Sequence, residues 1–222
     1  HMRAGDYVQA VALANRARVL ATNIKDQLGL AYSLNVLGSV EWFKGDFLNS
    51  LDYFLKTLEI RLTLDNKLDT ARSYNNLGSV YQEIGEFDKA RHYHTQSLAL
   101  MEQLEYDYGI ATSYFNLGVI HQRMDDSEQE QYFLEKALQA FTLLDDKAAL
   151  SEVRINLGHL KLRQAKLDEA KSNFDISRVD AAQLKNLSLL ARAQLGQAEI
   201  AFRHGKLAEA QDLAQQSLQL AE

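Results

Sequence analysis

The sequence predicts an all-α solenoid, in which antiparallel helix pairs repeat along the chain. A phrase that ends in Leu-Gly recurs every forty residues, and its glycines are Gly38, Gly78, Gly118 and Gly158. A fixed period of this size is typical of solenoids. Proline, which interrupts helices, is absent from all 222 residues. Within each repeat the apolar residues recur in steps of three and four, which is the α-helical period.

The composition is that of an ordinary folded protein and argues against several classes of partner. Hydrophobic residues make up 46% and charged residues 24%. No window approaches 18 uninterrupted apolar residues and no signal peptide is recognisable, so we expect a cytoplasmic protein that does not span a membrane. Cysteine is absent, which excludes disulfides and thiolate metal sites. The net charge of −6 argues against binding nucleic acid, since that affinity comes mostly from neutralising phosphates.

Each repeat is expected to contain two helices. A turn residue follows seven positions after each glycine, at Gly45, Gly85, Asp125 and Ala165, and a second amphipathic stretch comes after it. A fifth copy keeps this register, with Ala198 in place of the first glycine and Gly205 at the turn. The Gly/Ala position is expected to mark a close crossing of two helices, because a larger side chain would push their axes apart.

The repeats divide the chain into one array over residues 5–222. Gly5 and Ala10 occupy the turn and small-residue positions of an earlier repeat whose first half is missing, so residues 5–24 are expected to form an orphan second helix. Five helix pairs follow, at 25–64, 65–104, 105–144, 145–184 and 185–222, which makes about eleven helices in all. We expect residues 1–2 to be a tag remnant and the chain to have been cut from a longer protein.

These features resemble the tetratricopeptide repeat (TPR) family over residues 5–221. That family has Leu and a small residue in the first helix, then an aromatic such as Tyr81, and small residues such as Ala90 and Ser97 in the second. The period of forty exceeds the usual 34, which lengthens the helices by roughly one and a half turns. This long form is similar to LGN/Pins adaptors, kinesin light chains, bacterial Rap regulators and TPR sensor regions of signalling proteins. The resemblance implies a right-handed superhelix whose first helices line a concave groove.

Five asparagines fall on the groove positions that the resemblance implies. Asn76, Asn116 and Asn156 share one position, and Asn35 and Asn75 share the position before it. A carboxamide offers a donor together with an acceptor, which matches a peptide backbone. In the LGN-like relatives such asparagines hold the ligand's main chain, so the resemblance implies peptide binding here. The alternative is that they bond to neighbouring helices within the array.

Arginines form a second set of candidate groove residues. Arg123, Arg163 and Arg203 share one position, and the planar guanidinium group suits carboxylates, so they could read acidic groups of a partner. This position is also the last turn of a helix, where the helix dipole favours any cation. Arg72 and Arg192 lie near helix starts and are better candidates for contacting an anion.

Arg72 has an alternative role, because it could pair with Asp69 or Glu83.

The only tryptophan, Trp42, shares a groove position with Gln82 and Gln122. A large aromatic at an interface supplies much binding energy, so Trp42 could anchor an apolar side chain, or it could shield the interior of the first helix pair.

The expected function is that of a non-enzymatic protein–protein interaction module without metal or other cofactor. No phosphate loop, nucleophile motif or carboxylate pair is recognisable, and His92 and His94 should point away from each other. The groove would bind an extended or helical segment of a partner protein that carries acidic groups. The alternative is a regulatory or sensor region that acts by self-association into a homodimer or by contact with an output domain of its own chain.

Overall fold

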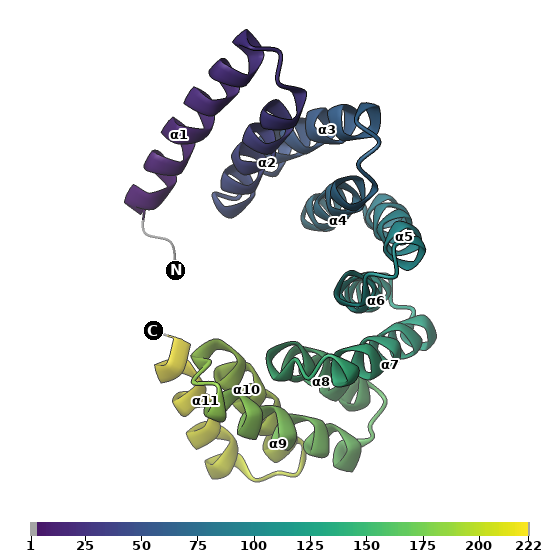
Figure 1. Cartoon of the computed structure of the whole chain (residues 1–222). Helices are drawn as coiled ribbons and strands as arrows, with labels where there is room; N and C mark the ends of the chain where they lie inside the picture. The colour runs from purple at the N-terminus through teal and green to yellow at the C-terminus, as the bar shows by residue number, and fades with distance from the viewer. Residues whose placement is uncertain (1–3, 222) are drawn as a thin grey trace. The chain divides into compact units, whose positions relative to one another are not determined.

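The computed structural model describes residues 4–221, which form helices and short turns only. The eleven helices of this part are shown in Figure 1. They are α1 (Ala4–Asn23), α2 (Gln27–Phe43), α3 (Phe47–Thr63), α4 (Lys67–Ile84), α5 (Phe87–Gln103), α6 (Asp107–Arg123), α7 (Ser127–Leu143), α8 (Lys147–Arg163), α9 (Leu167–Gln183), α10 (Leu187–Arg203) and α11 (Leu207–Ala221). The all-α class is therefore confirmed. The expected tag remnant, residues 1–2, lies outside the described residues.

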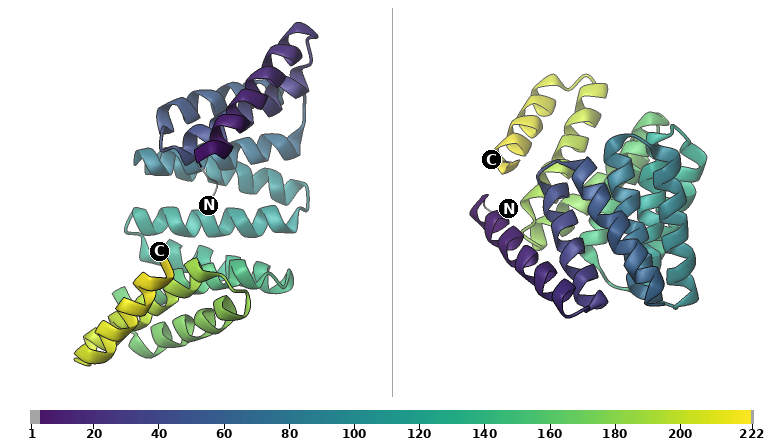
Figure 2. Two further views of the ribbon diagram at one scale, coloured as in Figure 1. Left: turned by 90° about the vertical axis from the view of Figure 1, so that its left-hand side faces the viewer. Right: turned by 90° about the horizontal axis from the view of Figure 1, so that it is seen from above.

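The chain divides into two compact units, and the boundary in the sequence falls within α6 between Ser113 and Tyr114. In the N-terminal unit, α2 packs on α3, α4 packs on α5, and α3 also packs on α4. In the C-terminal unit, α8 packs on α9, α10 on α11, and α9 on α10. Consecutive helices within each unit run antiparallel (Figure 2). We call α2, α4, α6, α8 and α10 the first helices of their pairs and α3, α5, α7, α9 and α11 the second helices. Within residues 4–221, no helix combines the length and apolar character that crossing a membrane would need.

The repeated glycines lie where a first helix touches the second helix of its pair. A methyl group on Gly158 would come within 2.7 Å of the Phe174 ring, and one on Gly78 would come within 2.6 Å of the His94 ring. The residue that faces the glycine is always sixteen positions later, as it is for Gly38. The predicted close crossings are therefore confirmed, since only hydrogen fits at these positions.

The turns repeat every twenty residues. The five predicted turn residues all have a positive φ; they are Gly45, Gly85, Asp125, Ala165 and Gly205. Five further turn residues with positive φ lead from each second helix into the next first helix; they are Lys25, Asp65, Glu105, Asp145 and Lys185. Asp126 and Asp146 cap the helices that follow them, because each accepts a bond from the backbone N–H three residues later.

Replacing Ala165 by glycine is expected to raise the free energy of unfolding by about 0.5–1 kcal/mol, because the left-handed conformation is costly for a residue with a Cβ atom. Ala165 has a φ of 58°. Urea unfolding followed by circular dichroism measures the effect. Gly205→Ala is the converse control: Gly205 has a φ of 74° and a methyl group there would touch nothing, so only backbone strain is added. Stability changes of the same sign in both variants would contradict this account.

Candidate functional site

Two adjoining cavities open on the face that the first helices present in the N-terminal unit. The first has a volume of about 200 Å³ and is lined by Ser39, Trp42, Phe43, Phe54, Asn76 and Ser79. The second has a volume of about 280 Å³ and is lined by Arg72, Asn75, Asn76, Ser97, Met101, Tyr106, Tyr108, Gly109, Thr112 and Ser113. Asn76 contributes to both. Four of the predicted groove residues, Arg72, Asn75, Asn76 and Trp42, therefore come together here.

The first cavity is aromatic. The Trp42 and Phe43 rings meet edge to face with their centroids 5.0 Å apart, and the Phe43 side chain is exposed. The indole nitrogen of Trp42 is buried and has no hydrogen-bond partner among residues 4–221. Buried indole N–H groups usually find an acceptor. The cavity thus has an apolar, aromatic wall, and the indole N–H of Trp42 is buried without an acceptor.

Asn76 bridges two first helices. Its Nδ2 donates to Oδ1 of Asn35 over 3.1 Å, which joins α4 to α2. This is the interhelical bond that the alternative interpretation anticipated. A carboxamide has two N–H donors and two acceptor lone pairs, so one such bond leaves most of the capacity of both side chains unused. Asn75 is half-buried and interacts with another group of the chain.

Arg72 stands at the second cavity on a buried polar network. It donates to Asp69 over 3.1 Å, as the sequence suggested, while about half of its side chain stays exposed. The buried Asp69 also accepts from the Tyr32 hydroxyl at 3.2 Å. Beneath it, the buried Arg61 donates to the Asp69 carbonyl and to the Ser73 hydroxyl. Burial lowers the pKa of the Arg61 guanidinium group, and the charge of Asp69 opposes this decrease. Of these two cations only Arg72 bonds to the Asp69 carboxylate, and its exposed part lies at the mouth of the cavity.

In the C-terminal unit the predicted arginines are largely engaged within the fold. Arg163 donates to the buried Glu130 carboxylate, with 2.7 Å to Oε1, and Gln122 donates to the same oxygen over 3.3 Å. Arg203 donates to the Leu162 carbonyl over 2.7 Å.

Arg192 approaches Glu152 to 3.6 Å. Arg123, which is exposed, makes no hydrogen bond or ion pair with the other described residues. Asn156 donates to the Glu152 carbonyl of its own helix over 2.9 Å. Asn116 is half-buried and also has a partner, and Gln82 is half-buried on α4 of the N-terminal unit.

Arg163→Leu is expected to lower the free energy of unfolding by about 2–3 kcal/mol at pH 8, because it leaves the buried Glu130 carboxylate without its countercharge. Burial raises the pKa of Glu130 and Arg163 opposes that rise, so the variant raises it further. A raised carboxyl pKa means that the cost appears as the pH increases and shrinks as the group is protonated. Urea unfolding should therefore show a smaller loss at pH 5. The double variant Arg163→Leu/Glu130→Gln should lack this pH dependence, and an equal loss at both pH values would contradict the explanation.

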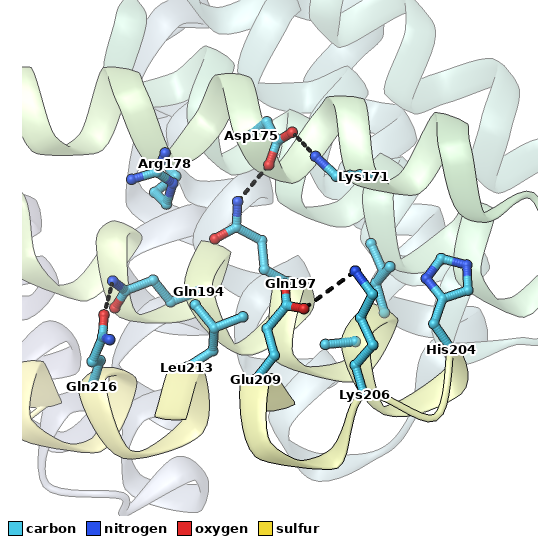
Figure 3. A pocket seen from close by; sticks show the side chains of 12 residues that line it. Lys171, Asp175, Arg178, Gln194, Gln197, His204, Lys206, Glu209, Leu213 and Gln216 are labelled. Carbon is cyan, nitrogen blue, oxygen red and sulfur yellow. Dashed lines mark hydrogen bonds and ion pairs between the residues drawn. The ribbon is translucent and has the colours of Figure 1, made fainter. Parts of the chain in front are cut away.

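A third cavity, of about 380 Å³, lies between α9, α10 and α11 (Figure 3). Its polar side chains mostly bond to one another. Asp175 accepts from both Lys171 and Gln197, and Lys206 pairs with Glu209 at 3.3 Å. The two cavities of the N-terminal unit are the better candidates for a binding site, because predicted groove residues line them and none lines the third cavity.

Phe54 and Tyr108 also line these cavities, although neither is among the predicted groove residues. Phe54 lies on a second helix and faces Gly38, so a search for the residue sixteen positions after each glycine would have found it. Tyr108 is in the first turn of α6, where no repeat signal marks it.

The tetratricopeptide repeat model matches residues 29–103 and, in a second overlapping match, residues 69–143, which together span more than half of the chain. No curated protein matches the sequence. Among solved structures, BtubC (BKLC) from P. vanneervenii is similar with a TM-score of 0.81 and 19% identity over 97% of this chain and 91% of that one.

Two further similar solved structures are complexes with a named binding partner. A Rap protein complexed with Competence and Sporulation Factor has a TM-score of 0.78 and 15% identity, and all of this chain spans 66% of that one. NprR in complex with its cognate peptide NprX has a TM-score of 0.71 and 14% identity over 96% of this chain and 66% of that one. Likeness at these identities establishes a shared fold.

Proposed function

The chain belongs to the tetratricopeptide repeat family, and from this premise we propose that the first-helix face of its N-terminal unit binds an extended segment of a partner protein. As a helical-repeat protein, the chain is a protein-interaction module. The structures of NprR with a peptide and of Rap with its factor, which share this fold, support a peptide as the ligand.

The observation that carries the proposal is that two cavities of different chemistry share Asn76. Neighbouring helices are about 8–10 Å apart, and an extended chain advances about 3.3 Å per residue. Side chains about three residues apart in a bound segment would therefore enter the two cavities. The amide between them would hold the main chain of that segment.

We assign a role to each side chain at this site. The carboxamides of Asn76, Asn35 and Asn75 would form hydrogen bonds to the peptide backbone. They would use the donors and acceptors that remain after their bonds within the fold. Trp42 would contact an apolar side chain of the ligand with its ring. Arg72 would pair with an acidic side chain, because about half of its side chain is exposed and its guanidinium group has further N–H donors beyond the one that bonds to Asp69.

In the C-terminal unit we propose the same kinds of contact on its own first helices. Asn116 and Asn156 would bond backbone, and Arg123 would take an acidic group. Arg163, Arg192 and Arg203 already have partners there, so their contribution should be smaller. A disordered segment loses conformational freedom on binding, so we expect about micromolar or weaker affinity for a short peptide.

The test begins with selection of peptides from a phage library on the immobilised chain, followed by fluorescence titration of the selected sequences. Asn76→Ala and Trp42→Ala should each weaken binding about tenfold, which corresponds to the loss of one well-placed contact. The matched control is Asn173→Ala, which removes an amide from a second helix, α9. The proposal fails if the selected peptides bind all four proteins equally while circular dichroism shows intact folding.

A further inference from the structure

A row of exposed leucines runs along α3. Leu48, Leu55 and Leu62 are 73%, 40% and 54% exposed. They are seven residues apart, which is close to two helical turns, so they lie on one side of the helix at intervals of about 10 Å. We call these three residues the leucine stripe. Single exposed leucines are common on protein surfaces, but an aligned row of this kind is not.

The other repeats show that the fold does not require the stripe. The same positions carry Asp88, Thr95 and Glu102 in α5, Glu128, Glu135 and Thr142 in α7, and Asp168, Asp175 and Ala182 in α9. The core contacts of α3 are made by different side chains, among them Phe54 and Leu58. A packing requirement of the repeat would recur in each copy. The leucines therefore belong to this helix alone.

The exposed charged residues of α3 and its ends are mostly acidic. Asp52 and Glu59 are exposed on α3, and Asp46 and Asp65 lie at its two ends. Over residues 46–65 the only exposed cation is Lys56, and it pairs with Asp52 at 2.6 Å. Arg61, the other cation of this segment, is buried. An apolar row with two carboxylates along one side is thus presented on α3.

We propose that the leucine stripe docks an amphipathic helix whose apolar row is bordered by lysine or arginine. The seven-residue spacing matches the seam between two packed helices, whereas a strand would place its side chains at a period of two. The border of carboxylates selects for a basic partner. A second copy of this chain fits less well, because two antiparallel α3 helices would bring Asp52 and Glu59 against the same residues of the other copy.

This inference does not depend on the proposed peptide site. The stripe lies on a second helix, whereas Asn76, Arg72 and Trp42 lie on first helices. Losing one surface should leave the other intact. The two can therefore be tested separately in the same protein.

The probe is a synthetic amphipathic helix about 20 residues long with leucines in one row and lysines on both borders; its charge-reversed counterpart carries glutamate in place of each lysine. Binding is measured by titration calorimetry. In the first variant, Leu48→Glu/Leu55→Glu/Leu62→Thr, α3 takes the residues that α7 has at these positions. We expect about tenfold weaker binding of the lysine peptide to this variant, and about tenfold weaker binding of the glutamate peptide to the unaltered chain.

Asn76→Ala is the control for the first-helix face and should bind the lysine peptide as the unaltered chain does. Loss of binding in this control would place the peptide on that face and overturn the proposal. Equal binding of the two peptides, or no binding of either, would also overturn it. Light scattering covers the remaining alternative: a dimer that becomes a monomer in the triple leucine variant would assign the stripe to a second copy.

Discussion

Truncating Phe174 to alanine is expected to lower the free energy of unfolding by about 3–5 kcal/mol, the usual cost of removing a large buried aromatic side chain. The Phe174 ring is fully buried in the core of the C-terminal unit, where it packs with Ile155 and Leu189. It also meets the His159 ring edge to face, with centroids 5.1 Å apart. Urea unfolding followed by circular dichroism measures the loss.

The glycines beside Phe174 provide the matched test of the same contact. A methyl group on either Gly158 or Gly196 would run into this ring, so the ring cannot retreat from one without striking the other. We expect Gly158→Ala to cost about 2 kcal/mol, although alanine is the better helix former by about 1 kcal/mol. The double variant Gly158→Ala/Phe174→Leu should cost less than the sum of the single changes. A stabilised Gly158→Ala variant would refute the close crossing.

Acidification is expected to destabilise the N-terminal unit through His94. This side chain is fully buried against Gly78, and neither ring nitrogen has a hydrogen-bond partner among residues 4–221. Burial lowers the pKa of His94 to about 4, whereas an unfolded histidine has a pKa near 6.5. Between these values only the unfolded state binds the proton, so the free energy of unfolding falls by about 3 kcal/mol as the pH drops through this window. Above the window both states are neutral and the effect is absent.

His94→Leu should remove this pH dependence and raise the free energy of unfolding at pH 7 by about 1–2 kcal/mol, because no unpaired polar group is then buried. Leucine is chosen because Leu134 occupies the same position in the next repeat. The fluorescence of Trp42, the only tryptophan, reports on this unit during urea unfolding at each pH. His92→Leu, on the exposed side of α5, is the control and should behave like the unaltered chain. An unchanged pH dependence in His94→Leu would contradict the role assigned to His94.

The candidate site could be predicted in part. Its position on the first helices followed from the family resemblance. Arg72, Asn75, Asn76 and Trp42 line two cavities, and Asn76 belongs to both. The bonding partners could not be predicted. Arg163 reaches Glu130 and Asn76 reaches Asn35, residues 33 and 41 positions away in the chain, and each competes with several chemically equivalent partners in the sequence.

The sequence by itself determined the helix pairs, their close crossings and half of the turns, because these depend on local periodicity and on positions where only a small residue fits, such as Gly158. Only the tertiary structure decided which polar groups are engaged inside the fold. It placed His94 without a partner where Phe54, Leu134 and Phe174 stand in the other repeats. The physical reason is that an apolar contact requires only an apolar surface, whereas a hydrogen bond requires a particular partner at a particular distance and angle.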